Sequence, residues 1–319
     1  MKCNPPSFSP RPWAHGIVFL VLCALVFWMT GCAVFTKTRE SGASGLVKGA
    51  DRGLSQKVGI LWPEVSNSSM DENLAKTFQD TFIQSVDRQS RTVLVSTPQD
   101  KTFPRQLMAV PRLPAGWADN FTLAKTGRQF GFNALVIAGV IDISGQEEES
   151  GFLWFKKTHR RVHLQGVLEI YDTETGAKLL DEEFAHTIDA GEAVPASSGA
   201  GKVEAAPMLT AAVTKLADAM GKKTGAVITG QPWKGYVVAV NGHQIVISPG
   251  ENSGLKPGMI FDVFDGVEIL AGQGGLKFFK PGRAMTGQIK LTAVQADRAE
   301  AVLVSGKLPR VDSTVRPPQ

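Results

Sequence analysis

The sequence predicts an α+β protein, with a three-layer α/β domain over residues 57–225 followed by a small all-β barrel over residues 231–317. Apolar runs typical of strands alternate with amphipathic helical segments in the first of these regions. Residues 134–141 (ALVIAGVI) are apolar throughout, which indicates a strand buried on both faces of a sheet. After Pro232 only short β-type runs follow, separated by Gly- and Pro-rich turns, which favours a barrel.

The first domain begins with a predicted strand over residues 57–62, which Pro63 ends because proline has no N–H for a sheet ladder. Ser69 and Glu72 have the spacing of a capping box and predict the start of a helix. That helix carries apolar residues on one face, namely Leu74, Phe78, Phe82 and Val86.

A short buried strand is predicted at residues 92–95, and a helix at 118–130 that Gly131 ends. A loop broken by prolines, residues 98–114, separates them. We expect the apolar run at 134–141 to be the central strand of a mixed sheet.

Alternating apolar and polar residues over 162–170 predict a strand covered on one face. A turn at 172–176 leads into a returning strand over 179–188. A closing helix is indicated by apolar residues three or four apart, at Leu209, Val213, Leu216 and Met220.

In the second region, Asn241-Gly242 between two apolar runs predicts a tight hairpin, because both turn positions need positive φ. Further strands are expected at 259–264, 286–293 and 299–304, with Gly272–Gly275 as a barrel turn. The absence of helical periodicity makes closure into a small barrel or sandwich the natural outcome.

The N-terminus has the layout of a signal peptide, since Lys2 and Arg11 precede an apolar stretch over 17–29 that is shorter than a spanning helix requires. Residues 29–32 (MTGC) resemble the lipobox of bacterial lipoproteins. The resemblance implies a cleaved signal (1–31), lipid on Cys32 and a flexible tether (32–56), with a plain secretory signal or an uncleaved anchor as the alternatives. In enterobacterial lipoproteins an Asp directly after the lipidated cysteine tends to retain the protein in the inner membrane. This sequence has Ala33 at that position, which implies the outer membrane.

Composition excludes several kinds of chemistry. After signal removal only Cys32 of the three cysteines remains, so no intramolecular disulfide, Cys-based catalysis or Cys-ligated zinc is expected. The formal charge is +4, or +2 without Lys2 and Arg11, and gives no support for nucleic-acid binding. No Gly-x-Ser-x-Gly elbow or phosphate loop is present, so we expect no enzyme and no cofactor.

Three histidines suggest a metal site as an alternative to a protein without bound metal. His159 and His163 lie four apart near one strand, and His186 lies on the returning strand. No carboxylate is fixed beside them, so solvated histidines are the preferred interpretation and no metal is expected.

Residues 254–264 (GLKPGMIFDVF), with the Asn241-Gly242 hairpin before them and residues 287–291 (GQIKL) after, resemble the C-terminal domain of flagellar assembly protein T. The first region resembles the middle domain of that family, a TolB-N-like fold shared with the curli-secretion lipoprotein and the lipoprotein activators of peptidoglycan synthases. The resemblance implies an SH3-like barrel. The sequence departs from the family in lacking a match to its N-terminal domain, and in having Val311-Asp312-Ser313 where relatives carry a Gly-Asp turn.

A contact surface is predicted in the connection between the strands that begin at 134 and 162. Four large apolar residues stand beside a basic cluster, which indicates binding to a partner protein or to lipid headgroups. The residues are Phe152, Leu153, Trp154, Phe155, Lys156, Lys157, Arg160 and Arg161. The alternative is that alternate members pack on the sheet, and the preceding Glu147–Glu149 are expected at a solvated hairpin tip.

These features together predict an outer-membrane-anchored lipoprotein on the periplasmic side that helps to assemble an envelope machine, with the flagellar basal body as the machine that the resemblance implies. Its expected partners are the membrane, through the lipid, and other envelope proteins of the flagellar basal body or of a secretion system, and homo-oligomerisation is open. The alternatives are a curli-type secretion pore subunit and a lipoprotein regulator of peptidoglycan synthesis. The charged connection at 146–161 fits poorly with the paired membrane strands of a pore.

Overall fold

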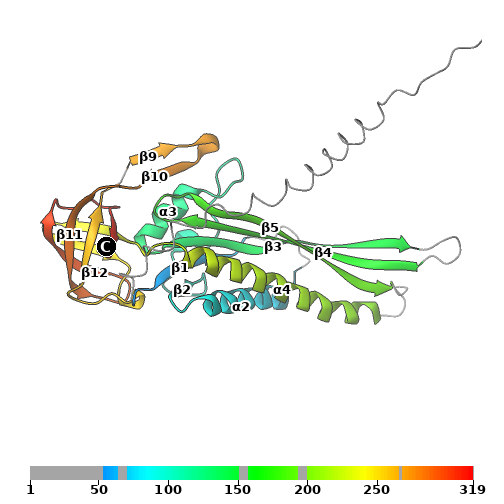
Figure 1. The fold of residues 1–319 in the computed structure, drawn as a ribbon. Helices are drawn as coiled ribbons and strands as arrows, with labels where there is room; N and C mark the ends of the chain where they lie inside the picture. Colours follow the sequence, from blue (N-terminus) through cyan, green and yellow to red (C-terminus); the bar gives the residue numbers. More distant parts are fainter. Residues whose placement is uncertain (1–52, 64–69, 151–156, 193–199, 266–267, 319) are drawn as a thin grey trace, which may run out of the picture. The chain divides into compact units, whose positions relative to one another are not determined.

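The computed structural model describes residues 53–63, 70–150, 157–192, 200–265 and 268–318. A five-stranded mixed sheet in the order β2-β1-β3-β4-β5 forms the centre of the α/β region (Figure 1). β3 is the middle strand, as predicted. β2, β1 and β3 are parallel, whereas β3, β4 and β5 are antiparallel. The strands are β1 (Gln56–Leu61), β2 (Val93–Ser96), β3 (Ala134–Ser150), β4 (Lys157–Asp172) and β5 (Lys178–Glu192).

Helices cover both faces of this sheet. Helices α2 (Glu72–Gln89) and α4 (Ala200–Thr229) pack together on one face, while α3 (Asn120–Gln129) and the 3-10 turn η1 (Arg105–Leu107) pack on the other (Figure 1). Successive residues of β3 alternate between the two cores, since Ala134 and Val136 belong to the first and Leu135 and Ile137 to the second. The predicted three-layer α/β architecture is confirmed.

The second region is a closed barrel in the order β11-β12-β7-β6-β13-β8. Trp233, Phe261 and Ile289 lie in its core, each at most 1% exposed. A hairpin forms at the predicted place, with Gly242 at φ 62°, but its two turn residues are Gly242 and His243, because Asn241 is the last residue of β6 and pairs with Gln244. The strands are β6 (Gly235–Asn241), β7 (Gln244–Ser248), β8 (Ile260–Phe264), β11 (Met285–Val294), β12 (Ala299–Gly306) and β13 (Thr314–Arg316).

A separate hairpin leaves the barrel and packs against the α/β region, which the sequence did not predict. Its strands are β9 (Glu268–Ala271) and β10 (Lys277–Lys280), and Gly272–Gly275 form its tip. The expectation that this glycine run is a barrel turn was therefore wrong. The Phe279 ring stacks on Phe121 of α3 with ring centroids 4.9 Å apart, and the Phe279 N–H donates to the carbonyl of Thr175 at 2.8 Å.

Two expectations about element ends were also wrong. The N-cap of α2 is Asp71, whose carboxylate accepts from the Leu74 N–H at 2.7 Å, and Glu72 is the first residue of the helix. Ser69 lies outside the described residues. Glu147–Glu149 belong to β3 and not to a hairpin tip, because β3 and β4 pair as far as Ser150 and Lys157.

The chain just before β1 is packed on the barrel. Leu54 is only 6% exposed and lies in the barrel core, and the Ser55 N–H donates to the carbonyl of Ser253 at 3.0 Å. The predicted tether extended to residue 56, yet its last residues are part of the folded unit and Gln56 already belongs to β1.

Among the helices that the structure describes, none has both the length and the apolarity needed to cross a bilayer.

Candidate functional site

A buried polar network joins the α/β region to the barrel. The turn after β4, Asp172–Gly176, meets the start of β6 there. The Thr173 hydroxyl lies 2.6 Å from the carbonyl oxygen of Phe132 and 2.8 Å from the Tyr236 hydroxyl, and the Asn133 amide donates to the carbonyl of Lys234 at 3.0 Å. The Thr173–Tyr236 and Asn133–Lys234 hydrogen bonds cross the junction between buried groups, so they help to hold the two parts together.

Arg128 of α3 is the centre of one half of this network and is only 1% exposed. Its guanidinium donates to the carbonyls of Thr173 (3.0 Å), Glu174 and Asp312 (3.0 Å). It also stacks 3.8 Å from the centroid of the Phe279 ring. Arg128 therefore fixes the turn after β4, the segment before β13 and the β9–β10 hairpin at the same time.

The other half of the network consists of paired charges. Lys234, with a side chain 3% exposed, donates to a carboxylate oxygen of Asp172 and lies 3.7 Å from Glu174. Arg316 of β13 contacts both oxygens of Glu174, at 2.6 and 2.8 Å. Because the two carboxylates come from the α/β region and the two cations from the barrel, the ion pairs cross the junction.

The junction also shifts the pKa values of two of its residues, Tyr236 and Asp172. Burial raises the pKa of Tyr236 well above its usual value, and the charges of Asp172 and Glu174 raise it further. Burial alone would raise the pKa of Asp172, but the Lys234 charge and hydrogen bonds from Lys234, Thr175 and the Glu174 N–H outweigh burial and lower it. Asp172 is therefore ionised in the folded protein at neutral pH.

This lowered pKa predicts an acid-dependent loss of stability. Because the pKa of Asp172 is lower in the folded than in the unfolded protein, its ionised carboxylate stabilises the folded state. This stabilisation is complete above the unfolded pKa of about 3.9 and is lost as the pH falls through the folded pKa. Asp172→Asn should therefore be less stable than the wild type near pH 7, and the difference should shrink below about pH 4. Urea unfolding of both proteins from pH 7 to pH 3 tests this, and a difference that stays constant would contradict it.

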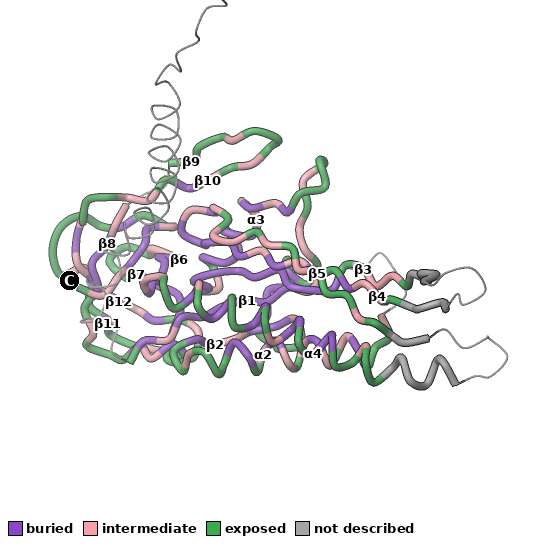
Figure 2. Tube along the Cα trace, turned by 45° about the vertical axis from the view of Figure 1, so that its right-hand side comes forward, coloured by how far each residue is buried: buried purple, intermediate pink, exposed green. Residues whose placement is uncertain are grey.

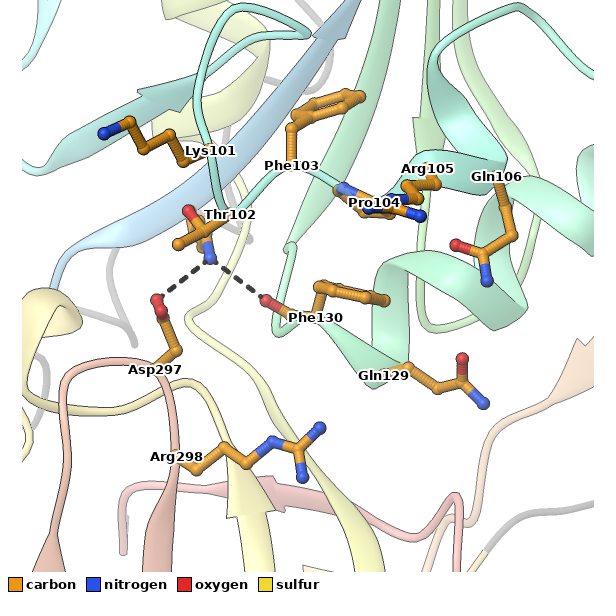
Figure 3. A pocket seen from close by; sticks show the side chains of 11 residues that line it. Lys101, Thr102, Phe103, Pro104, Arg105, Gln106, Gln129, Phe130, Asp297 and Arg298 are labelled. Carbon is orange, nitrogen blue, oxygen red and sulfur yellow. Dashed lines mark hydrogen bonds and ion pairs between the residues drawn. The ribbon is translucent and has the colours of Figure 1, made fainter.

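A cleft of about 500 Å³ adjoins the network, between the segment that follows β2 and the β11–β12 turn. The two dashed lines in Figure 3 are the hydrogen bonds that the Lys57 ammonium donates to Asp297 and to the carbonyl of Phe130, both at 3.3 Å. The cleft is lined by Lys57, Lys101–Gln106, Gln129, Phe130, Asp297 and Arg298. Four cations and one carboxylate give it a positive charge, which suits an anion.

Most of the residues that the sequence predicted as lipid-attachment or contact sites belong neither to the junction nor to the cleft. Cys32 and residues 152–156 are outside the described part of the chain. Lys157, Arg160 and Arg161 lie on β4, where Arg160 pairs in register with Glu147 and Arg161 with Gln146. These three residues of the basic cluster are thus on a strand and not in a loop.

The histidines do not converge. His163 pairs in register with Thr187, and His186 with Leu164, so the two rings project from opposite faces of the sheet. The Nδ1 atom of His163 lies 3.0 Å from the Thr187 hydroxyl. No group of three metal-ligating side chains comes together among the residues described.

Sequence reasoning missed the junction and the cleft. Asp172 and Glu174 were recognised only as turn residues, and Arg128 only as part of a helix. The available signal was the position of Arg128 four residues after Ala124, which puts both on one side of that helix, because a buried arginine needs partners. The spatial proximity of Lys57 and Arg298 has no sequence signal, since they are 241 positions apart.

No protein-family model matches the chain, and no curated protein matches it in sequence. Solved structures resemble part of it. A hypothetical protein from Chlamydia trachomatis is 9% identical, with a TM-score of 0.34 over 56% of this chain and 99% of that chain. A minor lipoprotein from Acinetobacter baumannii is 12% identical, with a TM-score of 0.29 over 54% and 93%. Uncharacterized lipoprotein B from Nitrosomonas europaea is 10% identical, with a TM-score of 0.31 over 57% and 90%.

Two of these three proteins are described as bacterial lipoproteins. At such TM-scores the similarity assigns neither a family nor an activity to this chain.

Proposed function

We propose that this protein is a lipid-anchored envelope scaffold. In this proposal Cys32 carries the lipid, the protein faces the periplasm from the outer membrane, and it assists assembly of an envelope machine without catalysing a reaction. The flagellar basal body is the machine favoured by the resemblance of residues 254–264 to the C-terminal domain of flagellar assembly protein T.

The observation that carries the proposal is the buried network between the α/β region and the barrel. A flexible linker would let the two parts move independently, whereas the Lys234–Asp172 pair and the hydrogen bond from Arg128 to the carbonyl of Asp312 fix one orientation. A fixed orientation lets surfaces on both parts meet the same assembly at once, which is the physical requirement of a scaffold.

The β3–β4 hairpin supports a contact surface at residues 152–161. Val140 of β3 is 1% exposed, whereas Ile141 is 36% exposed and none of residues 141–145 is buried (Figure 2). The pairing of β3 with β4 nevertheless continues to Ser150 and Lys157. The connection of this hairpin carries Phe152, Leu153, Trp154 and Phe155, and we include these residues with the basic cluster in the proposed partner or membrane contact.

Two variants separate anchoring from partner binding. Cys32→Ser should abolish incorporation of radiolabelled fatty acid and release the protein from the outer-membrane fraction, with unchanged far-UV circular dichroism. Trp154→Ser/Phe155→Ser should keep the lipid label and the membrane fraction but lose envelope proteins that co-purify with the tagged wild type. Retention of all co-purifying proteins by this stable variant would refute the contact, and lipid labelling of Cys32→Ser would refute the anchor.

The identity of the machine is tested by deletion. Loss of the protein should impair motility and basal-body assembly, and normal swimming with normal filaments would refute the flagellar form. A curli-type pore would instead give purified rings with conductance, and a regulator of cell-wall synthesis would co-purify with a peptidoglycan synthase.

A further inference from the structure

The cleft beside the junction is lined by more cationic side chains than its carboxylate can neutralise. Asp297 is the one carboxylate in its lining and is already paired with Lys57, whose side chain is 10% exposed. Lys101, Arg105 and Arg298 are exposed, and their side chains make no ion pair or hydrogen bond with any residue described. Three unpaired like charges around one space repel each other, and a bound anion would relieve that repulsion.

The backbone that carries these cations is held in place on both sides. In the segment after β2, the Phe103 N–H donates to the carbonyl of Asp100 at 3.0 Å, and Phe103 and Leu107 are buried. In the barrel turn, the Gln295 N–H donates to the carbonyl of Arg298 at 2.8 Å. The Lys57–Asp297 ion pair links the turn to β1. A preorganised site loses less entropy on binding than a mobile one.

Neutral polar groups complete the cleft. The side chains of Thr102, Gln106 and Gln129 line it, and Figure 3 shows Arg298 extending from the barrel turn toward the side on which Gln129 lies. Guanidinium groups bind phosphate and carboxylate through paired hydrogen bonds, and amides add further donors. The volume of about 500 Å³ is within the range of small-molecule sites.

We propose that this cleft binds a compact anionic ligand, or the anionic end group of a larger one, through phosphate or carboxylate oxygens. Arg105 of the α/β region and Arg298 of the barrel would contact the ligand from opposite sides, with Lys101 adding charge. The inference does not depend on the proposed scaffold function.

The test is isothermal titration of the full-length protein in a neutral detergent at 0.15 M NaCl, where the Debye length of about 8 Å screens non-specific attraction. Inorganic pyrophosphate and tricarballylate are the probes for phosphate and carboxylate. We expect saturable binding of at least one probe, weakened about tenfold or more by Arg105→Gln/Arg298→Gln. Binding of one probe alone would identify the oxygen chemistry, and both results support the site.

Arg91→Gln/Arg283→Gln is the matched control, because it removes the same charge from two exposed arginines outside the cleft. Its affinity should stay within about twofold of the wild type. The proposal is overturned if neither probe binds the wild type, or if the control loses as much affinity as the cleft variant. If the double variant does not fold, Arg298→Gln alone gives the same comparison.

Discussion

Replacing Lys234 by methionine should lower the free energy of unfolding by about 3–5 kcal/mol, because it leaves buried carboxylates without their cation. Methionine keeps most of the apolar stem, so the loss reports mainly on the ammonium. Asp172 would keep its hydrogen bonds from Thr175 but lose its ionic partner, and Glu174 would keep only Arg316. Urea unfolding monitored by tryptophan fluorescence measures the change.

Lys280→Met is the matched control, because Lys280 also forms an ion pair, with Glu268 at 2.7 Å, but on an exposed surface. Exposed pairs are worth about 0–1 kcal/mol, so this variant should stay close to the wild type. Adding Asp172→Asn to Lys234→Met should cost less than the sum of the two single changes, since it removes the uncompensated charge. Equal losses in Lys234→Met and Lys280→Met would show that the junction pair contributes no more than a surface pair.

Trp233→Ala is expected to cost about 3–5 kcal/mol, the range for removing a buried large aromatic side chain. Trp233 is 1% exposed and lies in the barrel core, with its ring centroid 5.4 Å from that of Phe261. Its indole N–H donates to the carbonyl of Ser55 at 3.2 Å, so the change also weakens the attachment of the chain that precedes β1. Thermal unfolding should show a single transition at a lower temperature, because the network couples the barrel to the α/β region.

Trp117→Ala provides the comparison, with the same atoms removed from a side chain that is 55% exposed. Its cost should be well under half that of Trp233→Ala. Two separate transitions in Trp233→Ala, with the α/β region melting as in the wild type, would contradict the coupling of the two parts.

The apolar elements were predictable because burial on a sheet or helix leaves a periodic signal. The continuous run at 134–141 identified the middle strand, and the helical spacing of Leu74, Phe78 and Phe82 identified the helix that packs on it. The Asn241-Gly242 dipeptide identified a barrel hairpin through the local backbone preference of Gly242, although the turn itself is shifted by one residue to Gly242-His243. In each case the information lies within a few neighbouring residues.

The junction was not predictable because its signal is not local. Asp172 and Thr175 form the turn that their residue types indicate, yet nothing nearby shows that Lys234 covers it. The β9–β10 hairpin was missed because its strands are four residues long and its outer strand is exposed throughout. The extent of β3 was underestimated because Glu147–Glu149 read as a solvated tip when considered without their partners on β4.

The burial of Leu54 sets the reach of the proposed anchor. If Cys32 carries lipid, only residues 33–53 separate it from the folded part at Leu54, and these 21 residues at roughly 3.5 Å each can span at most about 70 Å. The barrel could therefore reach no partner much farther than that from the lipid surface, and shortening the segment would restrict which periplasmic partners the protein can meet.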